Sequence, residues 1–463
     1  MKDGKEPDRE ETTVDIANPN AAPAGGAAEI ERETMTRVMR RLVPFLIICY
    51  FAAYLDRVNV GFAALTMNKA LGLSATAYGL GAGIFFIAYF IFEVPSNLFL
   101  ERFGARKWIA RIMLSWGLVS GLTAFIPWIA TTTGMSSASS FYAVRLLLGV
   151  AEAGFFPGII FYLTIWFPGV YRARVIGYFM AAIPLSTVIG SPISGALLGL
   201  DGVGGLEGWQ WLFILEAVPA ILLSVVVFFY LTDRPGDAHW LSAPQRTWLV
   251  ARLEAEQRQR EEARHFSVLE ALGDTKVLLL SIVYFGVVAA NYGLSFFLPQ
   301  IIKAFGLTNL ETGFVNAIPF VVGLLGMIYW GRRSDRLAER KEHVALASLI
   351  IGFGVAAATL TDGTIGKMIA FSAAGFGIFA VLPVFWTLPT AFLSGAAAAG
   401  GIAIINSIGN LAGFAGPFVM GKIKDSTGTF TVGLLAIVAL VGLAALLALS
   451  LEHDSELEKP PEG

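Results

Sequence analysis

Three polar side chains interrupt an apolar stretch near the start of the chain. Asp56, Arg57 and Asn59 lie within residues 42–67, a segment long enough to cross a bilayer, which takes about 20 apolar residues. A carboxylate can exchange a proton and a guanidinium can grip an anion, and charges in a membrane helix are rare unless they face a protein interior or a watery path. The group therefore indicates either a site for a charged solute and a proton or an ion pair that only braces a helix bundle.

A second acid and arginine share one face of a later apolar segment. Arg145, Gly149 and Glu152 are spaced at i, i+4 and i+7, so a helix presents them on one side, and Gly149 leaves room for another helix to approach. Arg57 and Arg145 are therefore candidates to bind an anion. Asp56 and Glu152 are candidate proton sites.

Other polar side chains within the apolar segments have less specific roles. Tyr89 can offer a hydroxyl to a solute, although packing explains it equally well. Glu93 lies one helical turn beyond Tyr89, where a structural or gating role is expected. Glu216 is expected to be a hydrogen-bond partner between helices.

The second half of the chain holds amides and hydroxyls where the first half holds charges. Asn291, Tyr292, Asn406 and Ser407 lie in apolar segments and could hold the polar remainder of a carboxylate solute. Hydrogen bonding between helices is an equally good explanation for Asn406 and its neighbours.

The composition places the chain in lipid. Of 463 residues, 56% are hydrophobic and 15% are charged, with a mean hydropathy of +0.67, whereas soluble domains have about 25% charged residues. The net charge of −2 provides no basic field for nucleic acid. Cys49 is the only cysteine, which excludes disulfides and a cysteine-based metal site, and the four histidines lie in polar connections or tails. We expect no metal and no cofactor.

Twelve apolar segments, each long enough to cross a bilayer, form two groups of six. They are residues 42–67, 78–100, 107–129, 140–166, 173–200, 209–231, 277–302, 311–331, 344–361, 365–387, 389–421 and 429–451. The chain then divides into a tail, a bundle, a central loop, a second bundle and a tail, at residues 1–41, 42–231, 232–276, 277–451 and 452–463. Residues 1 to about 29 are expected to be disordered and residues 30–41 to form a short surface helix.

Lysine and arginine in the short loops predict the orientation. The connections after the second, fourth and eighth segments are rich in arginine, whereas the opposite loops hold few basic residues. The positive-inside rule then places both termini and the central loop in the cytoplasm. Because a polar, acidic leader precedes the first segment and no small-residue cleavage site follows it, we interpret that segment as a retained helix.

The two halves repeat each other at a constant offset. Residues 69–73 (KALGL) align with residues 303–307 (KAFGL), and Lys107 aligns with Lys341, at the same separation of 234 positions. A register held across two loops and a whole segment indicates a duplicated six-helix unit. Such repeats place the binding site between the halves, near the bilayer midplane.

A charged loop motif occurs once in each half. Residues 97–107 read NLFLERFGARK and residues 331–341 read GRRSDRLAERK, which resembles the loop signature of the major facilitator superfamily. The first copy has Asn97 in place of a glycine and Glu101 in place of an aspartate, and the second has Ala338 in place of a glycine. Salt bridges at helix ends can lock one state and release another, so these charges are expected to act in gating, unless they only set topology. The gating candidates are Glu101, Arg102, Arg106, Asp335, Arg336 and Arg340.

Four further segments resemble the anion:cation symporter family within that superfamily. They are residues 55–61 (LDRVNVG), 92–97 (FEVPSN), 149–158 (GVAEAGFFPG) and 208–213 (GWQWLF). Bacterial tartrate and hydroxyphenylacetate permeases are the most similar members, and D-galactonate and hexuronate transporters are more distant. The resemblance implies proton-coupled uptake of organic anions. It also implies roles for this chain's Asp56, Arg57, Tyr89, Arg145 and Glu152.

The sequence thus predicts an all-α membrane protein with twelve transmembrane helices in two pseudo-symmetric bundles, the major facilitator fold. Its expected function is uptake of a small organic carboxylate by proton symport through alternating access, as a monomer in the bacterial inner membrane. An uncoupled facilitator or an exporter of organic anions is the alternative. A membrane sensor or enzyme has no supporting motif, since no phosphate-cradling loop or nucleophile elbow is present.

Overall fold

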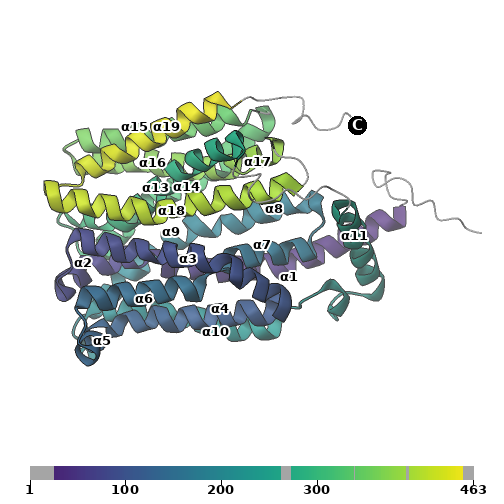
Figure 1. Cartoon of the computed structure of the whole chain (residues 1–463), viewed down its shortest axis with the longest axis horizontal. Helices are drawn as coiled ribbons and strands as arrows, with labels where there is room; N and C mark the ends of the chain where they lie inside the picture. Colours follow the sequence, from purple (N-terminus) through teal and green to yellow (C-terminus); the bar gives the residue numbers. More distant parts are fainter. Residues whose placement is uncertain (1–24, 262–272, 338, 393–395, 452–463) are drawn as a thin grey trace, which may run out of the picture.

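The computed structural model describes residues 25–261, 273–337, 339–392 and 396–451, and all regular secondary structure in these residues is helical (Figure 1). Within these described residues, twelve helical segments are long and apolar enough to cross a membrane. This result confirms the predicted all-α class with twelve spans. The two predicted tails lie largely outside the described residues, as do residues 262–272 of the predicted central loop.

In the first half, four of the six spans are interrupted rather than continuous. Asn59 separates the first two helices, and Gly154, with φ of +85°, begins the second part of the fourth span. A positive φ is easily reached only by glycine, so the chain can turn sharply two residues after Glu152. The helices are α1 (Gly25–Val58), α2 (Val60–Leu71), α3 (Ala75–Phe103), α4 (Ala105–Leu122), α5 (Ile126–Thr133), α6 (Ser137–Glu152), α7 (Phe155–Trp166), α8 (Gly169–Met180), α9 (Ala182–Leu197) and α10 (Gly208–Tyr230).

The second half repeats the first with longer unbroken helices. Helices α3 and α14 each contain 29 residues, and their first residues differ by 234 positions (309 minus 75). The offset found in the sequence is therefore also present in the helix boundaries. The helices are α13 (Thr275–Lys303), α14 (Asn309–Leu337), α15 (Lys341–Leu360), α16 (Thr364–Phe385), α17 (Thr387–Phe392), α18 (Ala396–Thr427) and α19 (Thr431–Ser450).

Three sequence-based boundaries need correction. Helix α1 begins at Gly25, so residues 25–29 are helical rather than disordered. Residues 30–41 are the first part of this same helix, not a separate surface helix. The tenth and eleventh spans are Thr364–Pro389 and Ile404–Thr427, whereas the apolar pattern predicted the eleventh at residues 389–421. The pattern began the eleventh span too early because apolar residues continue through the connection.

The connection between the halves carries its own helix, α11 (Ala243–Glu261), which packs against α1. Figure 1 shows α11 at the right-hand end of the molecule and α2 and α5 at the opposite end. We call these the α11 end and the α2 end. The predicted orientation makes the α11 end cytoplasmic.

The two halves contact each other closely at the α2 end. Helix α3 packs along α18, and α9 packs along α14. The contacts are close because glycines lack a side chain: a Cβ on Gly79 would overlap the Pro417 carbonyl, and one on Gly313 would overlap the Ser191 carbonyl. At this end the protein is therefore closed between its halves.

A carboxylate strengthens this closure. Asp425, near the end of α18, accepts hydrogen bonds from the backbone N–H groups of Ala75 (3.0 Å) and Thr76 (2.7 Å) in the first turn of α3. The first N–H groups of a helix have no partner within it, and the helix dipole favours a negative charge at that position. Asp425 thus caps a helix of the opposite half.

Loss of this cap should favour opening at the α2 end. Asp425→Ala is expected to remove about 1 kcal/mol from the closed state, a roughly fivefold change in the closed-to-open ratio, because two N–H groups lose their acceptor. Spin labels on cysteines at the exposed positions Met135 and Leu310, one in each half, would report this as longer distances in pulsed electron resonance. The native Cys49 is buried, so labelling is directed to the introduced sites.

Asp425→Asn, which keeps one acceptor oxygen, is the matched control and should stay close to the parent distance distribution. An unchanged distribution in Asp425→Ala would contradict a role for this cap in closure.

Candidate functional site

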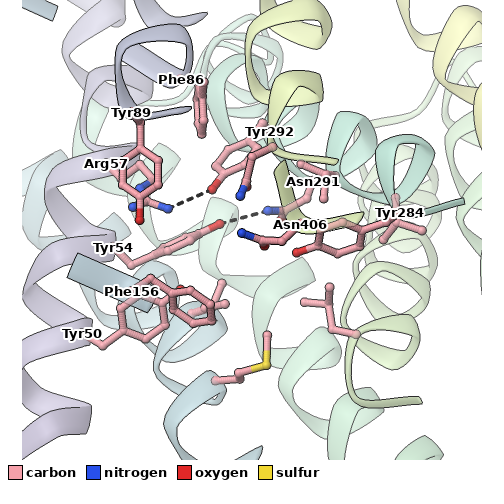
Figure 2. Close-up of a pocket in the computed structure, with 16 residues that line it drawn as sticks. Tyr50, Tyr54, Arg57, Phe86, Tyr89, Phe156, Tyr284, Asn291, Tyr292 and Asn406 are labelled. Atoms are coloured by element: carbon pink, nitrogen blue, oxygen red, sulfur yellow. Dashed lines mark hydrogen bonds between the residues drawn. The ribbon is translucent and has the colours of Figure 1, made fainter. Parts of the chain in front are cut away.

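A pocket lies between the two halves, at the level of the interrupted helices (Figure 2). Its wall uses matching positions of the repeat. Tyr50 and Arg57 on α1 line one side, and their equivalents at the 234-residue offset, Tyr284 and Asn291 on α13, line the other. The halves therefore present corresponding helix faces to one space, with the charge on one side and the amide on the other.

Arg57 provides the positive charge of this wall. It is 6% exposed, and its guanidinium forms an ion pair with Glu152 from α6. It also donates a hydrogen bond to the hydroxyl of Tyr292 across the pocket (3.2 Å) and lies over the ring of Tyr89 at 5.3 Å. Three residues that the sequence analysis had singled out as site candidates thus meet at the guanidinium of a fourth, Arg57.

Amides and phenol hydroxyls form the opposite wall. Asn291 donates to the hydroxyl of Tyr54 at 2.9 Å, and its side-chain oxygen has no hydrogen-bond partner (Figure 2). Asn406 and Asn410 on α18 complete the polar lining. These groups can donate to or accept from hydroxyls without adding charge.

A contact on the side of the pocket nearer the α11 end joins the two halves. Asn406 reaches the carboxylate of Glu93 on α3, at 3.5 Å. Glu93 is 9% exposed, and its second carboxylate oxygen has no partner. This position, toward the α11 end, agrees with the structural or gating role expected for Glu93.

Glu152 is held where α6 ends. It is 1% exposed, one carboxylate oxygen pairs with Arg57, and the other has no partner. A Cβ on Gly149, one turn earlier, would overlap the Phe85 carbonyl, so the glycine permits the close approach of α3 that the sequence suggested. Glu152 is therefore shielded from bulk solvent while one of its oxygens stays available for a further partner.

Asp56 is adjacent to Arg57 in the chain but faces away from the pocket. Its carboxylate accepts hydrogen bonds from the Trp116 indole (2.7 Å) and the Ser120 hydroxyl (2.9 Å) on α4, and from the Asn59 amide (3.4 Å). The acid of the first span therefore has neutral donors as its hydrogen-bond partners, while its neighbouring arginine is paired with Glu152.

Arg145 does not line the pocket. It is completely buried, and its guanidinium donates to the backbone carbonyls of Gly81 (3.3 Å) and Ala82 (3.4 Å) on α3. The ring of Phe85 lies within 5.3 Å of Arg145 and 5.5 Å of Arg57. The structure thus gives Arg145 a bracing position between α6 and α3. Ser407 is likewise not among the residues that line the pocket.

The predicted gating charges lie at the α11 end. Arg106 pairs with Asp233 at 3.7 Å, and Arg340 pairs with Asp335 at 2.6 Å. The first pair joins the first bundle to the start of the central loop, and the second lies within the second bundle, so neither pair joins the two bundles. Glu101, Arg102 and Arg336 are exposed.

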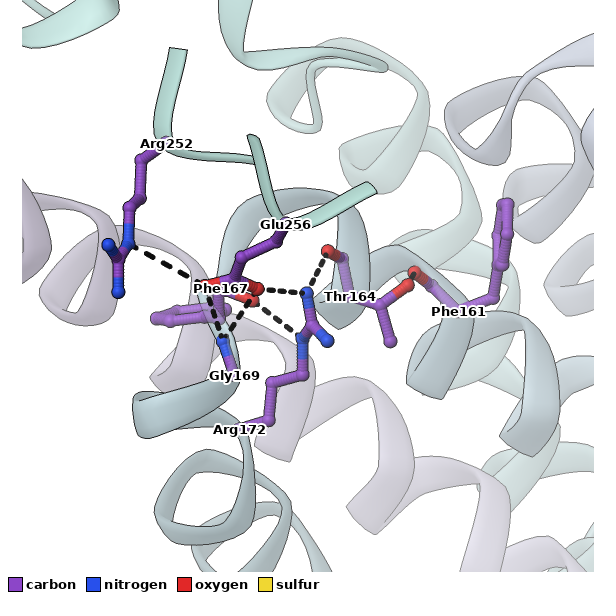
Figure 3. A network of polar contacts seen from close by, with 7 residues as sticks. All are labelled: Phe161, Thr164, Phe167, Gly169, Arg172, Arg252 and Glu256. Carbon is purple, nitrogen blue, oxygen red and sulfur yellow. Dashed lines mark hydrogen bonds and ion pairs between the residues drawn. The ribbon is translucent and has the colours of Figure 1, made fainter. Parts of the chain in front are cut away.

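A further polar network at this end involves Glu256 of α11, which the motif analysis did not find. Glu256 accepts from the Gly169 N–H (3.1 Å) and from Arg172 (3.4 Å), and Arg252 lies beside it (Figure 3). These contacts fasten α11 to the start of α8 in the first half.

Several pocket residues were missed from the sequence, chiefly the aromatic ones: Tyr50, Tyr54, Phe86, Phe156 and Tyr284. A signal was present. Tyr50, Tyr54 and Arg57 are spaced at i, i+4 and i+7, so they share a helix face. Applying the repeat offset to that face would also have identified Tyr284. For metals, the described residues contain no group of three histidine, cysteine or acidic side chains that could hold an ion.

The chain is similar to known proteins over most of its length. Residues 46–417 match the family model described as Major Facilitator Superfamily. A protein of Agrobacterium vitis named "Putative tartrate transporter" is 52% identical over 428 residues, which cover 92% of this chain and 96% of that protein. A quinolone resistance transporter of Acinetobacter baumannii is 43% identical over 421 residues, covering 90% of this chain and 94% of that protein.

A solved structure shares the fold. It is a bacterial homologue of the human lysosomal transporter Spinster in an inward-facing and occupied conformation, with a TM-score of 0.70 and 18% identity. The alignment covers 88% of this chain and 95% of that one. At this identity the likeness concerns the fold alone.

The placement of Arg145 gives a direct prediction. Arg145→Gln should lower the thermal stability, because about 2 kcal/mol of charge-assisted hydrogen bonding to α3 is lost, while the folded fraction keeps its affinity for a transported anion. Thermal denaturation and equilibrium binding on the same purified sample would test both statements. An unchanged melting temperature with a strongly weakened affinity would instead identify Arg145 as an anion-binding residue. Arg145→Lys, which keeps the charge, should have an intermediate stability.

Proposed function

The chain belongs to the major facilitator superfamily, and we propose that within it this protein takes up a small organic carboxylate anion by proton symport. The family match and the relatives are transporters, so the chain is a multi-pass membrane transporter and not an enzyme. The observation that carries the proposal is the buried Arg57, which faces the pocket and is neutralised by Glu152.

The proposed substrate carries at least one carboxylate and at least one hydroxyl group. Arg57 is the cationic side chain of the pocket wall, and a guanidinium binds a carboxylate through two parallel hydrogen bonds. Asn291, Asn406 and Asn410 with the tyrosine hydroxyls then suit the hydroxyl-bearing remainder. Tartrate fits this description, as the name of the similar Agrobacterium protein suggests. Sugar acids and hydroxylated aromatic acids are the other members of the class.

Coupling follows from competition for one guanidinium. A substrate carboxylate that binds Arg57 displaces Glu152, and a displaced carboxylate in a buried site is stable only when protonated. One proton would therefore enter with each anion. Asp56, behind the same helix, is proposed as a second proton site.

Alternating access would use the interface between the halves. In the described state the halves are closed at the α2 end, so the pocket would exchange with the α11 end. The opposite state would open the α2 end and bring together the charged loops that hold Glu101, Arg102, Arg106, Asp335, Arg336 and Arg340. With the predicted orientation, the present state faces the cytoplasm.

The loop charges and the pocket also suggest the membrane location, the orientation and the oligomeric state. The protein would lie in the bacterial inner membrane with both termini in the cytoplasm, as the loop charges predict. One chain contains the whole pocket between its own halves, so a monomer would be sufficient.

An exporter or uncoupled facilitator of organic anions is the second candidate. The similar quinolone resistance transporter favours it, because that name describes resistance rather than uptake. Uptake that persists when the proton gradient is collapsed would support this alternative.

The test is uptake of radiolabelled tartrate into proteoliposomes with an imposed inward proton gradient. Unlabelled galactonate, glucuronate and hydroxyphenylacetate serve as competitors. Accumulation that requires the gradient supports symport, and the competition pattern identifies the substrate class. Absence of gradient-driven uptake of radiolabelled tartrate, and of each of the other three anions when it is labelled in turn, would contradict the proposed function.

Glu152→Gln should separate coupling from translocation. The amide cannot carry the proton, so concentrative uptake should fall by at least about tenfold, while exchange of labelled for unlabelled substrate across the membrane should continue. The measurement compares accumulation under a proton gradient with counterflow in its absence. Glu207→Gln, at an acid outside the pocket, is the matched control and should accumulate substrate normally. Concentrative uptake by Glu152→Gln would contradict the assignment of Glu152.

A further inference from the structure

A second, smaller cavity lies toward the α2 end, separate from the substrate pocket. Its polar lining comes from four elements: the residue between α1 and α2, α9, α13 and α14. A single water-sized particle fills it. We call it the polar chamber, with the lining residues Asn59, Thr187, Ser191, Ser194, Ser295 and Asn316.

The polar chamber is lined by oxygen atoms that lack partners. The side-chain oxygens of Asn59, Thr187, Ser295 and Asn316 have no hydrogen bond from any residue that the structure describes, and each of these residues is at most 5% exposed. The amide nitrogens are already used: that of Asn59 donates to Asp56, and that of Asn316 donates to Ser191 at 2.9 Å. The amide oxygens are therefore left as acceptors. Buried polar atoms are normally satisfied, so four free oxygens around one small space can accept from or coordinate a single small occupant.

Two carboxyl groups lie behind the polar chamber, Asp56 on α1 and Glu216 on α10. The Asn59 amide connects them, since it donates to Asp56 at 3.4 Å and lies beside Glu216. Glu216 is 3% exposed, accepts from the Ser194 hydroxyl at 2.6 Å, and has a second oxygen without a partner. The bond to Ser194 of α9 confirms Glu216 as the hydrogen-bond partner between helices that its sequence position suggested, and its second oxygen stays free of partners among the described residues.

Neither acid has a cationic hydrogen-bond partner among the described residues. The charged groups near Asp56 are Glu152 and Arg145, and the charged group near Glu216 is Asp56 itself. Arg145 donates to carbonyls of α3, and Arg57 pairs with Glu152. A buried carboxylate with no cation bonded to it is unfavourable, so each acid either carries a proton or has a cation close by.

We propose that the polar chamber, with Asp56 and Glu216, is a binding site for a small monovalent cation, either hydronium or Na⁺. Neutral oxygens beside carboxylates are the ligands that hard cations prefer, and the space admits only a small ion. The proposal rests on the proposed function for its role in transport: the ion bound here would be the coupling cation, held on the opposite side of α1 from the anion on Arg57.

The site would also couple the ion to the conformation of the protein. Asn59 and the α9 residues belong to the first half, whereas Ser295 and Asn316 belong to the second. Opening of the α2 end would separate α9 from α14 and remove two oxygens from the polar chamber. A bound cation would therefore favour the state closed at the α2 end, because it binds that state more tightly.

Thermal denaturation of the purified protein without substrate tests the site independently of transport. The melting temperature is measured in NaCl and in choline chloride at equal ionic strength, each at several values of pH. We expect a rise of about 2 °C or more, either in Na⁺ relative to choline or on lowering the pH, which identifies the ion as Na⁺ or hydronium. Glu216→Gln and Asn316→Ala should each lose this rise. Glu311→Gln, at an exposed acid of the α2 end, should retain it.

The outcomes separate the two proposals. Equal melting temperatures in every condition, or a rise that persists undiminished in Glu216→Gln and Asn316→Ala, would overturn the cation site even if the protein accumulates tartrate. An ion-dependent rise that both variants lose supports the site even if none of the tested anions is transported. Asn316→Ala leaves both acids in place, so it tests the polar chamber itself rather than the charge of Glu216.

Discussion

One buried guanidinium constrains the rest of the structure. Arg57 lies inside a helix bundle made largely of apolar side chains, where an unpaired charge is expensive, and Glu152 neutralises it. If either charge is removed, the other is left unpaired. Arg57 and Glu152 can therefore separate only if each of them finds a new partner. In the proposed function, a carboxylate group of the substrate replaces Glu152 at Arg57 and a proton neutralises Glu152, so neither of these two buried charges is left unpaired.

The duplicated helix unit gives the site two matching walls, one from each half. The repeat sets corresponding faces of α1 and α13 against one pocket, so that each half contributes a wall. Glycines and the Asp425 cap hold the halves together at the α2 end through backbone contacts that rigid helices can make or release as units. The break at Gly154 lets α6 end where its last residue, Glu152, reaches Arg57.

The sequence predicted the fold and part of the pocket. The physical basis of these predictions also explains which site residues were predicted wrongly or missed. The offset of 234 and the apolar segments were sufficient for twelve helices in two halves, and Arg57, Tyr89, Asn291 and Asn406 do line one pocket. Helix periodicity places residues on a face but does not say what that face meets. Arg145 therefore was predicted to meet substrate but meets α3, and Asp56 meets α4. Tyr54 was missed because an aromatic residue in an apolar helix resembles ordinary packing.

The central claim is that the anion and Glu152 compete for Arg57, and proton uptake during binding tests it most directly. Tartrate is added to the purified protein in weakly buffered solution with a pH indicator, and bound substrate is measured in parallel. The account predicts uptake of about one proton for each anion bound, which Glu152→Gln abolishes without preventing binding. Tartrate binding without proton uptake in the unmodified protein, or proton uptake that is unchanged in Glu152→Gln, would contradict it.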